Sequence, residues 1–222
     1  MTSLVLSPSR RRSLAQATEL YESQVEQAGA YLISRGLSEE IAIEARLGYV
    51  GEPATGHEHY VGRLAIPYIS KAGVDQLKFR CISDHVCKNE GHAKYLYSEG
   101  DQPRLYNVLA FLEPSDVICV TEGEIDALSV HHLAGVPAVG APGVSSWRPF
   151  WNRLFVGHTR ILVIADGDDP GLEFAKSLVS GNTKRDISPL EGASIVRMPT
   201  GLDANSFIVQ EGVNAFRGRL GL

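Results

Sequence analysis

Two acidic clusters carry the residue types that could perform metal-dependent chemistry, and each directly follows a short apolar run. Residues 122–126 (Glu-Gly-Glu-Ile-Asp) follow the run 117–121, and residues 166–171 (Asp-Gly-Asp-Asp-Pro-Gly) follow the run 161–165. Short β-branched runs predict buried strands, and open α/β folds keep their sites beyond the carboxyl ends of parallel strands. Carboxylates this close together repel one another unless cations neutralise them, and Mg²⁺ binds oxygen ligands of this kind. The sequence therefore predicts a divalent-metal site.

The spacing within the clusters indicates which carboxylates could share that site. Asp126 comes four residues after Glu122, which is one helical turn along the same face. Asp166 and Asp168 flank Gly167, and a glycine permits a tight backbone path that lets both side chains point to one side. If the two strands are neighbours in the sheet, we expect these four carboxylates to converge.

The composition limits the classes of protein to which the chain could belong. The chain has 222 residues, 44% of them hydrophobic, which is enough for a sizeable core, and it has no apolar stretch of the length needed to span a bilayer. Cytoplasm is the expected location, and three cysteines do not suggest a disulfide framework. The net charge of −5 alone disfavours nucleic-acid binding. The two clusters hold six carboxylates, however, so bound metal would cancel much of the negative charge, and a polyanionic partner is not excluded.

The pattern of apolar runs predicts two domains. From residue 116 onward, strands alternate with helices, and this order predicts a parallel sheet covered on both faces; the expected elements are strands 117–121, 136–140, 160–165 and 193–198, and helices 124–134 and 170–180, with a terminal helix or two. In this α/β domain, Asp169 is the expected N-cap of the second helix, and Glu124 is expected to be an exposed helix charge.

The first half of the chain is predicted to be a smaller α+β subdomain with basic strands. Residues 1–12 are expected to be a flexible tail and Ser13 to open a helix, and strands 63–69 and 74–82 are expected to form a hairpin. A further short strand is expected at 94–97, and we place the boundary near 113–116. The predicted division is therefore 1–12, 13–114 and 115–222.

The two acidic motifs, Glu-Gly-x-x-Asp after one strand and Asp-x-Asp-x-x-Gly after a later one, resemble those of the Toprim domain. That Rossmann-like domain is shared by DnaG-type primases, topoisomerases, OLD-type nucleases and recombination-mediator proteins, and the resemblance covers residues 116 to about 211. It implies that Glu122 is a metal ligand or general acid/base and that Asp166 and Asp168 bind metal. Asp126 matches a further aspartate of the primases. Asp203 matches a third acidic motif of the primases, in which an asparagine here replaces the second acid.

The first half resembles the basic subdomain of the DnaG-type primase polymerase core, of the kind found in phages. Segments 62–67, 78–80, 94–98 and 104–108 follow the order seen in that family. The resemblance implies that basic and aromatic residues there line a groove for template, primer and nucleoside triphosphate; the matching residues are Arg63, Arg80, Lys94, Tyr95 and Arg104.

The resemblance implies that the chain synthesises an RNA primer on a single-stranded DNA template. It also implies that this reaction uses two or more Mg²⁺ or Mn²⁺ ions. The sequence contains no paired Cys-x-x-Cys zinc ribbon and no phosphate loop of a helicase motor. We therefore expect that a separate zinc-binding primase subunit or replicative helicase could be a partner, in the host cytoplasm if the chain is phage-encoded. Two alternatives remain open: a Toprim nuclease that uses the same metals, and a non-catalytic template-binding accessory subunit.

Four further residues have the chemistry of zinc ligands. Cys81, His85, Cys87 and His92 fall within twelve residues, in the spacing Cys-x₃-His-x-Cys-x₄-His. This spacing is not that of a common zinc knuckle. A polar loop between two strands, with Cys81 packed as a small hydrophobic residue, is therefore the preferred interpretation, and zinc is the alternative.

Overall fold

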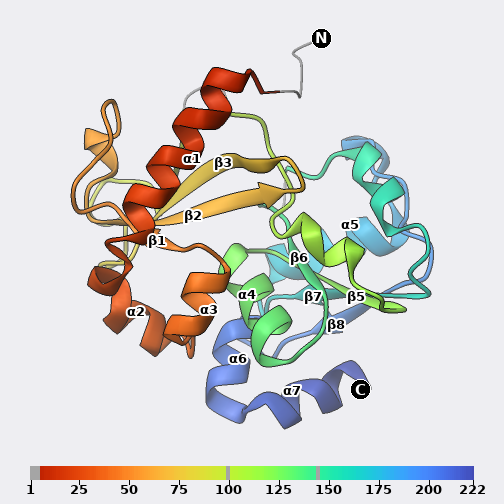
Figure 1. Ribbon diagram of the computed structural model, residues 1–222. Helices are drawn as coiled ribbons and strands as arrows, with labels where there is room; N and C mark the ends of the chain where they lie inside the picture. The colour runs from red at the N-terminus through yellow and green to blue at the C-terminus, as the bar shows by residue number, and fades with distance from the viewer. Residues whose placement is uncertain (1–5, 99–100, 144–145) are drawn as a thin grey trace. The chain divides into compact units, whose positions relative to one another are not determined.

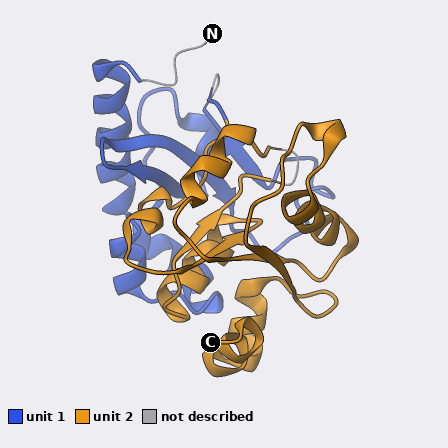
Figure 2. Ribbon diagram, turned by 90° about the vertical axis from the view of Figure 1, so that its right-hand side faces the viewer, with its two compact units in different colours: residues 1–102 blue, residues 103–222 orange. Residues whose placement is uncertain are grey.

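The computed structural model describes residues 6–98, 101–143 and 146–222 (Figure 1). The chain divides into two compact units, Met1–Gln102 and Pro103–Leu222, which are coloured separately in Figure 2. Unit 1 is α+β and unit 2 is α/β with a parallel sheet, so the predicted fold class is confirmed.

Unit 1 is built on an antiparallel sheet of order β1-β2-β3-β4. Phe79, Leu77 and Val74 on one face of β3 pack with Leu14 and Tyr21 of the first helix to form its core. The predicted hairpin is confirmed as β2 and β3. The elements are α1 (Pro8–Glu22), η1 (Val25–Ala28), α2 (Gly29–Ser34), α3 (Glu39–Glu44), β1 (Gly48–Tyr49), η2 (Glu58–Tyr60), β2 (Arg63–Ser70), β3 (Gly73–Cys81) and β4 (Tyr95–Tyr97).

The first helix begins earlier than the sequence predicts. Ser7, rather than Ser13, caps α1, because its side chain accepts a hydrogen bond from the backbone N–H of Arg10 at 3.2 Å and Pro8 suits the first helical position. Residues 8–12 are therefore helical and not part of a tail, and residues 1–5 of the expected tail lie outside the described residues. Arg11 forms an ion pair with Asp75 at 2.9 Å.

Unit 2 is built on a parallel sheet of order β6-β5-β7-β8. Alternate strand residues face opposite sides: Ile118 and Val163 pack in one apolar cluster with Phe174, whereas Cys119 and Leu162 pack in another. Both faces are therefore covered, as the sequence predicts. The elements are η3 (Val108–Leu112), β5 (Val117–Thr121), α4 (Glu124–Leu128), η4 (Ser129–Leu133), β6 (Ala138–Gly140), η5 (Pro149–Phe155), β7 (Arg160–Ala165), α5 (Asp169–Ser180), η6 (Thr183–Arg185), β8 (Ala193–Arg197), α6 (Ala204–Glu211) and α7 (Val213–Leu220).

The division between the units falls after Gln102, earlier than the boundary expected near 113–116. The reason is that the segment after Gln102 already pairs with unit 2. The backbone N–H of Tyr106 donates to the carbonyl of Gly140 at 2.8 Å, and Leu105 and Ala110 belong to the core of that unit. Within the described ranges, no helix is both long enough and apolar enough to cross a membrane.

Candidate functional site

Strands β5 and β7 are hydrogen-bonded neighbours, and this places the two acidic motifs side by side. Val120 pairs with Val163 in parallel register, so both strands end at the same edge of the sheet. Just beyond that edge, the backbone N–H of Asp166 donates a hydrogen bond to Oε1 of Glu122 at 3.1 Å. The geometry that the sequence predicts for these two acids is therefore present.

The loop after β7 lies against the loop after β8. The backbone N–H of Gly167 donates to the carbonyl of Leu202 at 2.8 Å, and the N–H of Gly201 donates to the carbonyl of Gly167 at 3.3 Å. A Cβ atom at position 167 would lie 1.8 Å from the carbonyl oxygen of Pro199, so a glycine is required there. This contact brings the loop that carries Asp203 to the loop that carries Asp166 and Asp168.

Two of the five acids also begin helices. Oδ1 of Asp168 accepts a hydrogen bond from the N–H of Gly171 at 2.8 Å, and Oδ1 of Asp203 accepts one from the N–H of Ser206 at 2.7 Å. The N-cap of α5 is thus Asp168, and the predicted cap, Asp169, is the first helical residue. The caps use one oxygen of each carboxylate and fix the orientation of both side chains.

Asp126 is buried beneath this edge and is held by α6. Its Oδ1 accepts a hydrogen bond from the backbone N–H of Asn205 at 2.9 Å, and the Asn205 side chain donates to Oγ of Ser129 at 2.8 Å. The prediction that Glu124 is an exposed charge is wrong, because every residue of the short helix α4 is buried. Burial raises the pKa of Tyr106, and the charge of the nearby Glu124 carboxylate raises it too.

The five carboxylates share one electrostatic environment. Burial, and with it the charges of Asp126, Glu122, Asp203 and Asp168, raises the pKa of Asp166 to about 8. Burial and the charge of Asp168 also raise the pKa of Glu122, although the hydrogen bond from Asp166 opposes this. Such crowded negative charge fits a divalent cation, and an all-oxygen donor set suits Mg²⁺ or Mn²⁺. Among the described residues, however, these carboxylates do not form a group of three or more placed to hold a metal ion.

One face of β3 and β4 in unit 1 carries the predicted basic and aromatic residues. Arg80 lies opposite Tyr95 in the antiparallel register, and its guanidinium donates to the Tyr95 hydroxyl. The guanidinium carbon also lies 5.1 Å from the Tyr95 ring centroid and 5.5 Å from that of Tyr31. Lys78 joins this face, with its Nζ 4.2 Å from the Tyr95 centroid and 5.0 Å from that of Tyr97. Cationic groups and aromatic rings are thus interleaved.

The other predicted basic residues have different surroundings. Arg63 is largely structural, since its guanidinium donates to the carbonyls of Ala93 at 3.1 Å and Lys94 at 3.3 Å. Lys94 is exposed. Arg104 is half-buried and belongs to unit 2, whereas the other four predicted residues belong to unit 1. Lys78 was not among the predicted site residues, although its position two residues before Arg80 on a strand indicates the same face.

Comparison with known proteins identifies the family. Residues 119–208 match the family described as Toprim-like. The Gene 57 protein of Mycobacterium phage D29 is 39% identical over 166 residues, which is 72% of this chain and 99% of that protein. The chain belongs to the family of this phage protein and contains a Toprim-like domain.

Solved structures show the fold to which this Toprim-like protein belongs. The RNA polymerase domain of Mycobacterium tuberculosis primase DnaG has a TM-score of 0.74 and 20% identity, and the match covers 97% of this chain and 84% of that one. A DnaG primase catalytic domain bound to single-stranded DNA has a TM-score of 0.70 and 19% identity, with 97% and 82% covered. The chain has the fold of DnaG primase catalytic cores.

The stability of the metal-free Toprim-like protein should depend on pH through Asp166. Because the folded state raises the pKa of Asp166 from 3.8 to about 8, the folded chain keeps a proton that the unfolded chain releases between these values. Stability should therefore fall as pH rises from about 4 to about 8. Asp166→Asn should stabilise the metal-free chain at pH 8 by about 1–3 kcal/mol and have a much smaller effect at pH 4.

Urea unfolding in the presence of a chelator, at both pH values, measures this difference. Added Mg²⁺ should stabilise the unsubstituted chain at pH 8 and should not stabilise Asp166→Asn. The exposed Asp186 offers a matched control, since Asp186→Asn should change neither result. If the free energy of unfolding depends on pH equally in the unsubstituted chain and in Asp166→Asn, the raised pKa assigned to Asp166 is contradicted.

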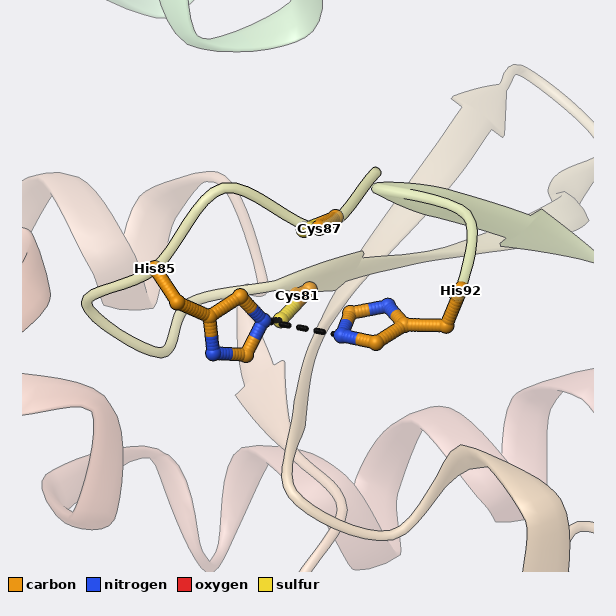
Figure 3. A group of neighbouring side chains, drawn as sticks. All are labelled: Cys81, His85, Cys87 and His92. Atoms are coloured by element: carbon orange, nitrogen blue, oxygen red, sulfur yellow. Dashed lines mark hydrogen bonds between the residues drawn. The ribbon is translucent and has the colours of Figure 1, made fainter. Parts of the chain in front are cut away.

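The four zinc-type residues of the first unit come together in the structure. The ligand atoms of Cys81, His85, Cys87 and His92 all lie within 4.8 Å of one another (Figure 3). Cys81 is half-buried at the end of β3 and has two imidazoles and a second thiol for neighbours. The expectation that it packs as a small hydrophobic residue therefore does not describe its surroundings.

Proposed function

We propose that the chain is a DNA primase-type nucleotidyltransferase that joins ribonucleotides on a single-stranded DNA template. The observation that carries this proposal is the environment of Asp166, whose pKa is raised to about 8 by burial and by four surrounding acids at the carboxyl edge of a parallel sheet. Such a site is suited to hold cations that contact phosphate oxygens. Several reactions could use such a site, and the DnaG-core fold favours primer synthesis among them.

Asp166 and Asp168, together with Asp126, Asp203 or Glu122, are the residues that would hold the ions. Bound Mg²⁺ or Mn²⁺ would supply activation of the primer 3′-hydroxyl and neutralisation of the triphosphate. The chain itself contributes orientation, because the helix caps fix Asp168 and Asp203 before any substrate arrives. Glu122 has a raised pKa and is held by the Asp166 N–H, so it is suited to accept the proton of the attacking hydroxyl.

The basic and aromatic face of unit 1 is the surface that we propose for nucleic acid and nucleotide. Lys78 and Arg80 are only 3% and 6% exposed, so they supply positive charge from beneath this face, whereas Tyr95 supplies a half-buried ring and Lys94 an exposed cation. Single-stranded nucleic acids bind such surfaces through phosphates and stacked bases. A structural neighbour solved with single-stranded DNA supports a DNA template as the ligand. A replicative helicase or a separate zinc-binding primase subunit would be a partner in this reaction.

Incorporation of labelled ribonucleotides on single-stranded DNA, with Mg²⁺, with Mn²⁺ or with chelator, tests the proposal. Metal-dependent elongation would support the primase. Degradation of the template would instead indicate a nuclease that uses the same carboxylates. Template binding without either reaction would indicate an accessory subunit. Each of the last two outcomes would overturn the proposal.

Lys94 should contribute to template binding as an exposed phosphate contact. Lys94→Ala should weaken the affinity for single-stranded DNA by about 3–10-fold, and it should lower the slope of log K against log salt by about 0.7, because one fewer counterion-releasing contact is made. Titration of a fluorescent oligonucleotide at several salt concentrations measures both quantities. Lys71→Ala, at the exposed turn between β2 and β3, is the matched control and should change neither. An unchanged salt slope in Lys94→Ala would exclude the phosphate contact.

A further inference from the structure

The segment between β3 and β4 in unit 1 has little apolar packing of its own. It runs from Ile82 to Lys94, most of its residues are exposed, and the side chain of Val86 is 63% exposed. Its internal hydrogen bonds are turn contacts such as the one from the N–H of His92 to the carbonyl of Cys87 at 3.1 Å. A loop of this length without a core is unusual unless something else holds its conformation.

The side chains that converge inside this loop have the spacing of a metal-ligand set. Sγ of Cys81 lies 3.6 Å from Nε2 of His85. In a tetrahedral site with Zn–S and Zn–N bonds of about 2.3 and 2.05 Å, the sulfur and nitrogen atoms lie about 3.6 Å apart. Nε2 of His85 lies 2.8 Å from Nε2 of His92, as the dashed line in Figure 3 shows. Binding of an ion would increase this distance between the two Nε2 atoms to about 3.3 Å.

The orientation of His92 suits it to bind a metal through the ring nitrogen that faces the cluster. Its Nδ1 lies 3.1 Å from the carbonyl oxygen of Ala93 and 3.4 Å from a guanidinium nitrogen of Arg63, and we assign the shorter contact as an Nδ1–H that donates to the Ala93 oxygen. The lone pair is then on Nε2, which points at His85. Metal-bound histidines generally donate their other ring N–H to such an acceptor, which fixes the tautomer and the ring. The guanidinium of Arg63 also donates to the Ala93 carbonyl, at 3.1 Å.

We propose that Cys81, His85, Cys87 and His92 bind one zinc ion. Two thiolates and two imidazoles form a donor set that selects zinc over Mg²⁺, and four protein ligands complete a tetrahedron without a position for water. The site is therefore structural rather than catalytic. It is separate from the carboxylates of unit 2, and it does not depend on the function proposed for them.

The ion would hold one wall of a groove within unit 1. A cavity of about 1160 Å³ is lined by the loop itself and by Tyr31, Arg35, Arg80 and Lys94. Cys81 directly follows Arg80, and His92 comes two residues before Lys94. Zinc binding would thus fix the backbone at both ends of the loop and hold these two basic residues in place. Removal of the ion should leave the loop mobile and open to cleavage at Lys88.

Metal analysis of the full chain, purified under reducing conditions, tests the proposal. We expect about one zinc ion per chain. Replacement by Co²⁺ should give the intense visible bands of a tetrahedral site and a thiolate charge-transfer band. Cys81→Ser, Cys87→Ser, His85→Asn and His92→Asn should each lose the ion or the spectrum. Cys119→Ala is the matched control, because that buried cysteine belongs to unit 2 and should retain both.

Two further measurements keep the test decisive if a substituted chain fails to fold. X-ray absorption of the unsubstituted zinc protein should show two sulfur and two nitrogen scatterers. Chelation should speed tryptic cleavage at Lys88, and added Zn²⁺ should reverse this. The proposal is overturned if the reduced protein binds no stoichiometric zinc, if Cys81 and Cys87 form a disulfide instead, or if metal binding survives in the four substituted chains.

Discussion

Asp168→Asn is expected to lower metal-dependent nucleotide incorporation at least about 10³-fold while the fold persists. A carboxylate ligand contributes to charge stabilisation worth several kcal/mol in the transition state, and each 1.36 kcal/mol is a factor of ten in rate. Asparagine is chosen over alanine because Asp168 also caps α5. An asparagine oxygen can still accept the hydrogen bond from Gly171, so the helix keeps its first turn.

The neighbouring Asp169 provides the control for this experiment. It is exposed, and as the first residue of α5 it does not cap the helix. Asp169→Asn removes the same charge one residue away and should change the incorporation rate less than about 3-fold. Circular dichroism and thermal unfolding should match the unsubstituted chain in both cases. Retained activity in Asp168→Asn, or an equal loss in both substituted chains, would contradict the assignment of Asp168 as an ion ligand.

Gly171→Ala should damage the site without removing any acid. The added Cβ would lie 2.3 Å from Oε1 of Glu122 and 2.9 Å from the backbone nitrogen of Asp166. It would therefore break the hydrogen bond that joins the two acidic motifs. We expect a loss of activity of about 10–100-fold, as for other residues that orient metal ligands, and destabilisation of about 1–3 kcal/mol from overpacking.

Gly218 in α7 is the matched control for that substitution. Among the described atoms, a Cβ at this helical glycine would meet nothing within 4 Å. Gly218→Ala should therefore stabilise the chain by about 0.5–1 kcal/mol and leave activity unchanged. The two substitutions are compared by incorporation rate and by urea unfolding. Normal activity in Gly171→Ala would show that the contact between Glu122 and Asp166 is not needed for the reaction.

The positions of the main acids could be predicted because strand patterns determine them. The runs before Glu122 and Asp166 are short and β-branched, and their order along the chain indicates parallel neighbours. The helix cap could not be predicted to the residue, because Asp168 and Asp169 have the same capping ability and only the backbone path decides between them. Burial of Glu124 likewise depends on how unit 2 covers a five-residue helix, which local pattern does not determine.

Side-chain convergence within loops was the harder prediction. The spacing of Cys81, His85, Cys87 and His92 matches no common motif, so the sequence alone favoured a polar loop, whereas the folded loop brings all four ligand atoms together. Segment boundaries were also displaced. Residues 103–114 join unit 2 through backbone pairing at Tyr106 that no local signal predicts.

The backbone contact between Gly167 and the segment from Pro199 to Leu202 has a consequence for how this site tolerates change. Because the two loops share hydrogen bonds and leave no room for a side chain at position 167, a shift in one is transmitted to the other. An insertion or deletion between Pro199 and Asp203 would alter the spacing of carboxylates that it does not touch. We therefore expect the length of this connection to matter for ion binding as much as the acids themselves.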